Sequence, residues 1–312
     1  MKTITFLIPI HNEEKNIPLV YEKTSGISEK YKSYHFEWLF IDDGSTDKSS
    51  EVLSKLAYSN KDVKVLEFTR NFGKEIALTA GVHHINSDAV IIMDADLQHP
   101  PDKIPDFIKQ WEEDHDIVLG KRKKIENRSP VKKLGSYFFY KIINRISDTE
   151  MKPGTTDFML IDNKVLSSLK SFTERNRIFR GLVDWIGFNK TYVEFEAPDR
   201  LYGSEQYSMK KLIQLAINSF TSFSLFPLKI TGYFGIFISS FSGLLLLYML
   251  ADKFILNLNN FRPIAYVAVS NVFLIGVVMI ALGLIALYIG NIHVEVVNRP
   301  IYIVKNKRNF ED

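Results

Sequence analysis

The chain has 312 residues, of which 24% are charged and 46% hydrophobic, and these proportions exclude an intrinsically disordered protein. The formal net charge of +3 is too small to require nucleic acid as a partner. Because the chain contains no cysteine, disulfides and thiolate metal sites are excluded, and a bound metal is expected to be a hard cation such as Mg²⁺ or Mn²⁺.

Before about Ser204, short apolar segments alternate with amphipathic ones. This alternation predicts βαβ units and a mostly parallel sheet that is covered by helices on both faces. Ligands bind such sheets at the carboxyl ends of the strands, so the loops after the first, second and fourth strands are candidate sites. The predicted strands are Thr3–Ile8, Glu37–Ile41, Val63–Phe68, Ala89–Met93 and Asp116–Leu119, and the predicted helices are Lys15–Tyr31, Asp47–Tyr58, Lys74–His84 and Pro101–Glu113.

The loop Asp42–Asp47 follows the second predicted strand and begins with two adjacent carboxylates. Gly44 permits a tight turn and Ser45 or Thr46 can cap the next helix, so a plain strand–turn–helix junction explains part of the loop. It does not explain the neighbouring carboxylates, which repel each other unless another group binds them. Since carboxylates accept hydrogen bonds from base N–H groups and ribose hydroxyls, a nucleoside is the expected ligand.

A second acidic loop follows the fourth predicted strand, where Asp94 and Asp96 are separated by one residue and Gln98 follows. Alternate residues of an extended segment point the same way, so both carboxylates can bind one cation. A cation that bridges diphosphate oxygens would help a nucleotide to leave. Asp-x-Asp patterns also occur in ordinary surface turns, and the position at a strand end is what favours a metal site.

The densest basic stretch is Lys121–Lys124, continued by Arg128, Lys132 and Lys133. Two interpretations are open: a solvated face without a ligand, or a surface that attracts anionic headgroups and binds a lipid phosphate. The following segment, Ser136–Ile146, is predicted to be a helix whose apolar side chains can touch a membrane.

After the first domain, the chain contains two long segments without charged residues. Ile230–Ala251 and Ile264–Ile292 carry no charge over 22 and 29 residues, so each can cross a bilayer core of about 30 Å. Buried helices of a soluble domain are the alternative. Residues 207–229 combine lysines with phenylalanines and are expected to lie on the membrane surface as an amphipathic helix, or to connect the parts as an ordinary packed segment.

The two spans would form a hairpin, because the linker 252–263 is too short to be a domain. The tail, residues 293–312, carries more Lys and Arg than the linker, and the positive-inside rule therefore places the tail and the N-terminal domain in the cytoplasm. Met1–Ile10 lacks the features of a signal peptide, in agreement with this orientation. We expect an integral protein of the cytoplasmic membrane with a first domain over residues 1–206.

Four segments of the first domain carry a family resemblance: Pro9–Glu14 (PIHNEE), Asp42–Asp47 (DDGSTD), Arg70–Lys74 (RNFGK) and Met93–Pro101 (MDADLQHPP). In this order they resemble glycosyltransferase family 2, and more narrowly the polyprenyl-phosphate glycosyltransferases, which include dolichyl-phosphate mannose synthases and bactoprenol glucosyltransferases. The resemblance covers nearly the whole chain, since the two terminal spans are similar to those of the bactoprenol-type members. It implies a GT-A (Rossmann-like) fold, a nucleotide-sugar donor, a divalent metal and inversion at the anomeric carbon.

The resemblance also implies roles for residues that match the motifs by position. The catalytic residues would be Asp157, within Thr155–Phe158, and Asp94. The remaining roles would be nucleotide-sugar binding by Pro9, Asn12, Glu13, Asp42, Asp43, Lys74, Asp94 and Ala95, metal binding by Asp94, Asp96 and Gln98, and binding of the acceptor phosphate by Arg122, Lys132, Ser136 and Arg200. Phe179–Phe188 also matches the family, and core packing explains its aromatic residues.

One segment departs from the family pattern. Relatives usually show Arg-x-x-Gly-x-Ser-Lys-Tyr at the end of the domain, where serine and lysine assist phosphate binding. Residues 200–207 keep the arginine, glycine and tyrosine but place Glu205 and Gln206 at the serine and lysine positions. Because a carboxylate opposes a phosphate, the phosphate role of this segment rests on Arg200, and Ser204 is a candidate for the missing hydroxyl.

The sequence therefore predicts a metal-dependent, inverting glycosyltransferase that moves glucose from UDP-glucose to a polyprenyl phosphate at the cytoplasmic membrane face. A GDP-mannose-dependent mannosyltransferase is the alternative donor assignment. A non-catalytic membrane scaffold for sugar-lipid translocation is the alternative from another class. The expected partners are the nucleotide-sugar, polyprenyl phosphate and the lipid bilayer, and the sequence is compatible with a homo-oligomer.

Overall fold

The computed structural model describes residues 1–123, 154–173, 178–198 and 299–310, together with single positions and short runs between 264 and 297. The chain divides into two units, residues 1–208 with 299–312, and residues 209–298. Several sequence-based assignments lie outside the described residues: Lys132, Ser136, Arg200, the helix 136–146, the segment 207–229 and the span 230–251.

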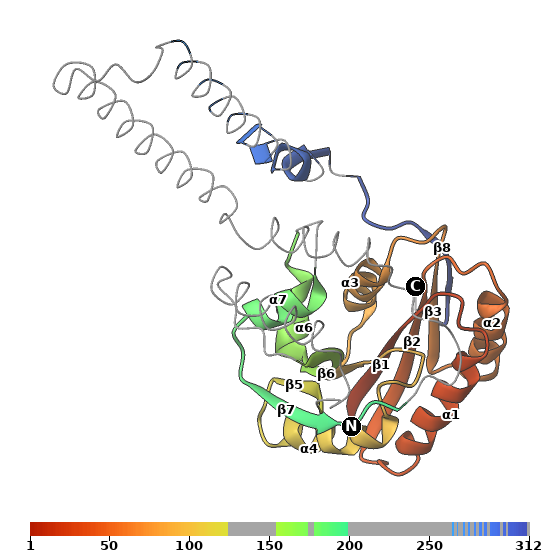
Figure 1. The fold of residues 1–312 in the computed structure, drawn as a ribbon. Helices are drawn as coiled ribbons and strands as arrows, with labels where there is room; N and C mark the ends of the chain where they lie inside the picture. The colour runs from red at the N-terminus through yellow and green to blue at the C-terminus, as the bar shows by residue number, and fades with distance from the viewer. Residues whose placement is uncertain are drawn as a thin grey trace. The chain divides into compact units, whose positions relative to one another are not determined.

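A mixed eight-stranded sheet forms the centre of the first unit, in the order β7-β5-β6-β4-β1-β2-β3-β8 (Figure 1). Strands β3, β2, β1 and β4 are parallel, as the alternating sequence pattern predicts. Strand β6 is antiparallel to both β4 and β5, and β8 is antiparallel to β3. The bounds are β1 (Lys2–Ile10), β2 (Tyr34–Asp42), β3 (Val63–Phe68), β4 (Ala89–Ile92), β5 (Ile117–Arg122), β6 (Thr155–Asp162), β7 (Lys190–Phe195) and β8 (Val304–Arg308).

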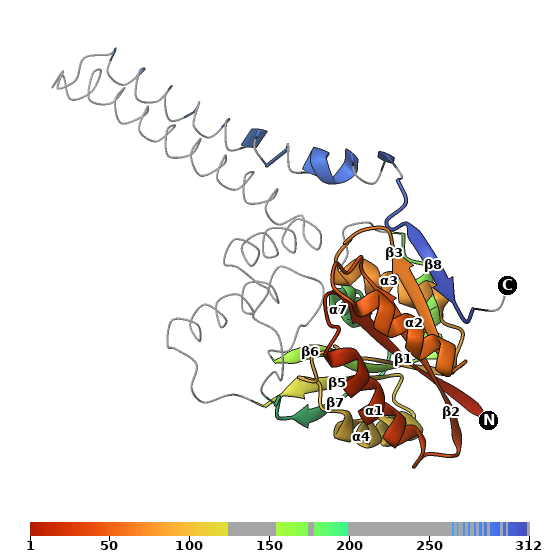
Figure 2. The same cartoon turned by 90° about the vertical axis from the view of Figure 1, so that its right-hand side faces the viewer.

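Helices cover both faces of this sheet (Figures 1 and 2). One face carries α1 (Asn16–Ser28), α2 (Ser49–Ser59) and α4 (Ile104–Glu112), and the other carries α3 (Lys74–His84), α6 (Asn163–Lys170) and α7 (Phe179–Trp185). A 3₁₀ turn, η1 (Pro101–Lys103), precedes α4, so the helix predicted over 101–113 begins with a tighter turn at its prolines.

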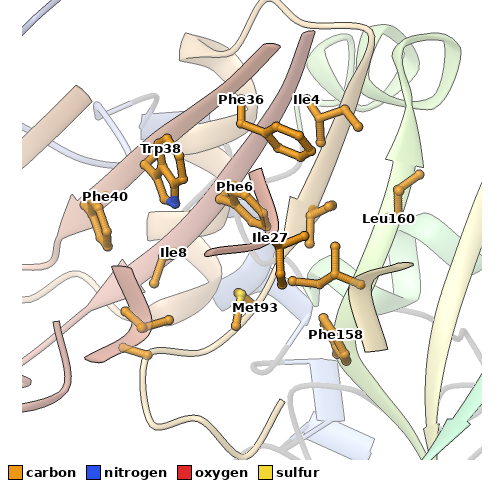
Figure 3. Packing of buried hydrophobic residues seen from close by; sticks show 14 of the residues in the cluster. Ile4, Phe6, Ile8, Ile27, Phe36, Trp38, Phe40, Met93, Phe158 and Leu160 are labelled. Carbon is orange, nitrogen blue, oxygen red and sulfur yellow. The ribbon is translucent and has the colours of Figure 1, made fainter. Parts of the chain in front are cut away.

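The alternating side chains of β1 pack on both layers of helices. On the α1 side, Phe6 stacks on Phe36 and Trp38 at centroid distances of 5.7 and 5.6 Å (Figure 3). On the α3 side, Gly81 lies directly against the Leu7 side chain, where a Cβ would collide. This close approach holds α3 against the sheet and so fixes its first residue, Lys74, near the carboxyl ends of the strands.

Strand β8 lies within residues 293–312, the predicted cytoplasmic tail. Its Lys305 Nζ and Asn306 Nδ2 bind the carboxylate of Glu67 in β3 at 2.6 and 2.9 Å, and Glu67 is only 5% exposed. The sequence VKNKR has no apolar alternation, and its pairing partner lies more than 230 positions away, so local pattern does not reveal the strand.

In the second unit, the described positions between Ile264 and Val297 are helical and include exposed apolar side chains, among them Ile264, Val278 and Ile289. Across the positions that the structure describes, no helix is both long and apolar enough for a bilayer crossing. The predicted span 264–292 is described only in part.

Candidate active site

The loops after β1 and β2 are tied together by Asn12. This residue has a φ of 59°, and its side-chain oxygen accepts hydrogen bonds from the backbone N–H groups of Thr46 and Asp47 at 2.8 and 3.3 Å. Its own N–H donates to Ser45 Oγ at 3.0 Å. Asn12, predicted to line the nucleoside pocket, therefore holds these two loops in one arrangement.

The adjacent carboxylates Asp42 and Asp43 have different environments. Asp42, at the end of β2, is 1% exposed and accepts the Ser45 N–H at 3.0 Å; burial raises its pKa despite that bond. Asp43 accepts the N–H groups of Phe72 and Gly73 at 2.6 and 2.9 Å, one on each oxygen. The repulsion between the two carboxylates is thus relieved partly within the protein, and Asp43 fixes the loop that precedes α3.

The other predicted donor-site residues lie at the same edge of the sheet. Pro9 is the penultimate residue of β1, and the Glu13 N–H donates to Ser49 Oγ at 2.9 Å. The Glu13 carboxylate accepts from Asn16 Nδ2 at 2.6 Å. Ala95 is 3% exposed and lies just beyond β4.

Lys74 joins the two predicted catalytic carboxylates. Its Nζ lies 2.5 Å from Asp94 Oδ1 and 2.8 Å from Asp157 Oδ2, which brings together α3, the end of β4 and the start of β6. Burial raises the pKa of the Asp157 carboxyl, but Lys74 and then Arg180 lower it well below its usual range. The two carboxylates in turn hold the pKa of Lys74 above its usual range although burial lowers it. Burial raises the pKa of Asp94 as well, but Lys74 and then His99 lower it below its usual value, so all three groups are charged at neutral pH.

In the predicted metal loop, Ala95 is buried while Asp94 and Asp96 are partly exposed. Ala95 and Asp96 lie in a turn and not in the extended segment that the prediction assumes. Leu97 adopts a φ of 59°, and the next N–H, that of Gln98, donates to Asp96 Oδ1 at 3.1 Å. Strained backbone of this kind is concentrated at functional sites.

His99 holds this loop in place, a role that the sequence analysis does not assign. Its Nδ1 accepts the backbone N–H of Asp94 at 3.0 Å, and its ring stacks on Phe158 at 5.1 Å. Burial lowers the pKa of His99, in agreement with a neutral ring that accepts at Nδ1. The signal was present in the motif, where His99 follows Gln98 directly.

The residues of the loop fit a hard cation. Within the described part of the chain, no group of three His, Cys, Asp or Glu side chains gathers to hold a metal. Mg²⁺ is commonly bound by one or two carboxylates together with substrate phosphate oxygens, which is the number that Asp94 and Asp96 supply. Because Asp94 Oδ1 is paired with Lys74, the cation would be bound mainly through Asp96.

On the acceptor side, the structure describes only Arg122 of the predicted phosphate ligands. It is the last residue of β5, and its Nη2 lies 3.5 Å from Gln98 Oε1, beside the metal loop. Two further charged residues belong to the site. Glu75 accepts the Phe179 N–H at 2.6 Å, and Arg180 donates to the Thr155 carbonyl oxygen at 2.8 Å.

Comparisons with known proteins place the chain in a family. The family model described as Glycosyl transferase family 2 matches residues 5–170. The SfII prophage-derived bactoprenol glucosyl transferase of Shigella flexneri is 39% identical over 302 residues, 97% of each chain. The prophage bactoprenol glucosyl transferase homolog of Escherichia coli (strain K12) is 38% identical over 302 residues, 97% of this chain and 98% of that one.

Among solved structures, glucosyl-3-phosphoglycerate synthase from Mycobacterium tuberculosis, in complex with Mn²⁺, UDP and phosphoglyceric acid, is 17% identical. The match covers 70% of this chain and 75% of that one, with a TM-score of 0.45. The family match and the near full-length relatives confirm the resemblance that the motifs indicate: the chain belongs to glycosyltransferase family 2.

Proposed function

We propose that the protein transfers glucose from UDP-glucose to bactoprenol phosphate, with inversion at the anomeric carbon. The observation that carries this proposal is the cluster of Lys74, Asp94 and Asp157 at the carboxyl edge of the sheet. The acceptor and the sugar are those named for relatives that match nearly the whole chain, such as the bactoprenol glucosyl transferase of Shigella phage SfII, which is 39% identical.

The donor nucleoside binds between the loops after β1 and β2. Asp42 offers a buried carboxylate at the end of β2 to a base N–H or a ribose hydroxyl, with Pro9 and Glu13 on the neighbouring strand end. Asn12 and Asp43 keep the loops around it in place through their hydrogen bonds to backbone N–H groups. Lys74 adds a positive charge that favours the donor diphosphate.

Asp94, Asp96 and Gln98 would hold Mg²⁺ or Mn²⁺ together with the diphosphate oxygens. When bound, the metal supplies Lewis-acid stabilisation of the charge that develops on the departing nucleotide. The Asp96 carboxylate is positioned for this by the N–H of Gln98, and the Asp94 backbone by His99.

The sugar is transferred in a single displacement. An acceptor phosphate oxygen forms a bond to the anomeric carbon as the bond to the diphosphate oxygen breaks on the opposite face. Since the second pKa of a phosphate monoester is about 6, the acceptor is mostly ionised at neutral pH and needs no strong base. Asp157, kept ionised by Lys74, stabilises the positive charge that develops on the sugar or orients the acceptor.

A lipid acceptor places the reaction at the membrane. The exposed apolar side chains of the described helical positions between 264 and 297 support a membrane-embedded hairpin, with the catalytic domain and the C-terminus in the cytoplasm. Arg122, with Lys132, Ser136 and Arg200, would bind the acceptor phosphate at that surface.

A transfer assay tests the proposal. Full-length protein in detergent is given UDP-glucose, Mg²⁺ or Mn²⁺ and bactoprenol phosphate, and lipid-linked glucose and released UDP are measured in equal amounts if the proposal holds. GDP-mannose replaces UDP-glucose in a parallel reaction, and mannosyl lipid formed there instead would correct the donor. Release of UDP with free glucose, independent of lipid, would identify a hydrolase and refute transfer.

A further inference from the structure

Arg180 adds a second cation to the cluster of Lys74, Asp94 and Asp157. Its Nη1 donates to the carbonyl oxygen of Thr155 at 2.8 Å, two positions before Asp157 in β6. Burial raises the pKa of the Asp157 and Glu75 carboxyls, and the nearby positive charge of Arg180 lowers both. The guanidinium is therefore part of the electrostatic environment of the predicted catalytic carboxylate.

In the described part of the chain, this cation has no ion-pair partner. Lys74 is the ion-pair partner of both aspartates, and among the described residues no carboxylate oxygen lies within 4.0 Å of the Arg180 guanidinium. Its Nε is buried and has no hydrogen-bond acceptor in the same set of residues. A buried charged donor without an acceptor is unfavourable, so the site favours an anion that supplies the missing acceptor.

The position of Arg180 is fixed from two sides. The Thr155 carbonyl oxygen binds its Nη1, and the preceding residue, Phe179, donates its N–H to Glu75 Oε2 at 2.6 Å. Glu75 directly follows Lys74 in α3, so one helix places both cations around Asp157. A guanidinium held in this way is preorganised, because little side-chain freedom remains to be lost when a ligand binds.

We propose that Arg180 binds a phosphate oxygen of a substrate beside Asp157. The inference rests on the proposed function, which supplies two phosphate sources: the monoester of the polyprenyl acceptor and the diphosphate of the donor. Planar guanidinium groups bind phosphate oxygens through paired N–H donors, and either source offers the same chemistry.

Two binding measurements on the full-length protein in detergent separate these sources. Calorimetric titration with UDP-glucose and Mg²⁺ measures donor affinity, and titration with farnesyl phosphate, a short polyprenyl phosphate, measures acceptor affinity. Arg180→Gln removes the charge, Arg180→Lys keeps a charge without the paired donors, and Lys164→Gln is the control, since Lys164 is exposed and paired with Asp116 at 3.3 Å.

Arg180→Gln is expected to weaken one of the two affinities roughly 10- to 100-fold, as the loss of a charged hydrogen bond does, and Arg180→Lys to recover part of it. Weakening of farnesyl phosphate binding assigns Arg180 to the acceptor, and weakening of UDP-glucose binding assigns it to the donor. If both affinities stay within twofold of wild type in Arg180→Gln and in Arg180→Lys, or in the one of them that folds, with Lys164→Gln equally unaffected, the inference is overturned.

The same titrations distinguish this inference from the proposed function. Wild-type protein that binds both ligands but transfers no glucose would refute the proposed function, and the Arg180 comparison would still decide phosphate binding. Melting temperatures of the two Arg180 variants show which of them is folded, so that a loss of affinity is not confused with unfolding.

Discussion

Lys74 Nζ lies 2.8 Å from Asp157 Oδ2, although 83 positions separate the two residues in the chain. The contact exists because β6 is inserted beside β4, so that its first residues meet the start of α3. It keeps Asp157 ionised, and the proposed transfer reaction needs a fixed negative charge at this position more than a proton acceptor.

Asp157→Asn is expected to lower kcat for glucose transfer by about 100-fold or more, because the charge opposite the developing positive sugar is lost. The affinity for UDP-glucose should change little, since the proposed binding site of the donor nucleoside lies at the ends of β1 and β2. Steady-state kinetics with bactoprenol phosphate and titration with UDP-glucose measure the two quantities. Wild-type turnover in this variant would remove Asp157 from the reaction.

Asp96→Ala is expected to abolish metal-dependent transfer, because Asp94 is already paired with Lys74 and cannot replace it as the main ligand. Chelation of the wild-type protein by EDTA should have the same effect and be reversed by Mg²⁺ or Mn²⁺. Asp106→Ala is the matched control, since Asp106 is an exposed carboxylate paired with Lys103 at 2.9 Å. Full activity of chelated wild-type protein would contradict the metal assignment.

Glu75 predicts a pH dependence of stability. Burial, and then the charge of Asp157, raise the pKa of Glu75 from 4.5 to about 7, although the Phe179 N–H and the cations Lys74 and Arg180 lower it. Between pH 4.5 and about pH 7, Glu75 is protonated in the folded protein and ionised in the unfolded chain. The folded protein therefore binds more protons, and its free energy of unfolding falls as pH rises through this range. Compared with its value below pH 4.5, the free energy of unfolding is lower by on the order of 3 kcal/mol above pH 7.

Glu75→Gln removes this titration and keeps an oxygen that can accept the Phe179 N–H. The melting temperature of Glu75→Gln minus that of wild type should therefore be more positive at pH 8 than at pH 5. Glu112→Gln, a carboxylate outside the site, serves as the comparison. A melting-temperature difference between Glu75→Gln and wild type that is the same at both pH values would show that Glu75 titrates normally.

The contact of β8 with Glu67 predicts that residues near the end of the chain contribute to the stability of the catalytic domain. Asn306→Ala leaves one oxygen of the buried Glu67 without its amide donor, and the expected loss is about 1–3 kcal/mol. The double variant Glu67→Leu with Asn306→Ala should recover part of that loss, because the buried charge is also gone. Thermal melting of the single and double variants measures both effects; equal stability of Asn306→Ala and wild type would contradict the role of Asn306.

The contact between β8 and Glu67 also affects Asp42, a predicted donor-site residue, because Glu67 pairs with Asp42 in the register of β3 and β2. Burial raises the pKa of Asp42, and the negative charge of Glu67 adds to this effect. Lys305 from β8 neutralises the charge of Glu67 by an ion pair, and Asn306 donates a hydrogen bond to it. Strand β8 therefore belongs to the surroundings of Asp42, which is predicted to bind the nucleoside.

Local sequence pattern was sufficient for the first half of the catalytic domain. Apolar alternation predicted β1 to β5 and α1 to α4 to within a few residues, and Val63–Phe68 and Lys74–His84 have the predicted bounds. The acidic loops after β2 and β4, with the other motifs, were enough to identify the family. These features are encoded in short segments, because strand and helix periodicity and turn residues depend on near neighbours in the chain.

Only the tertiary structure determined which of these residues contact one another. Asp42 and Asp43 look alike in sequence, yet Asp43 accepts two backbone N–H groups from the loop before α3 while Asp42 stays at the strand end. The pairing of Lys74 with Asp157 and of Glu75 with Phe179 depends on the order and direction of strands across the sheet. Contacts between residues so far apart are set by packing, which no local pattern contains.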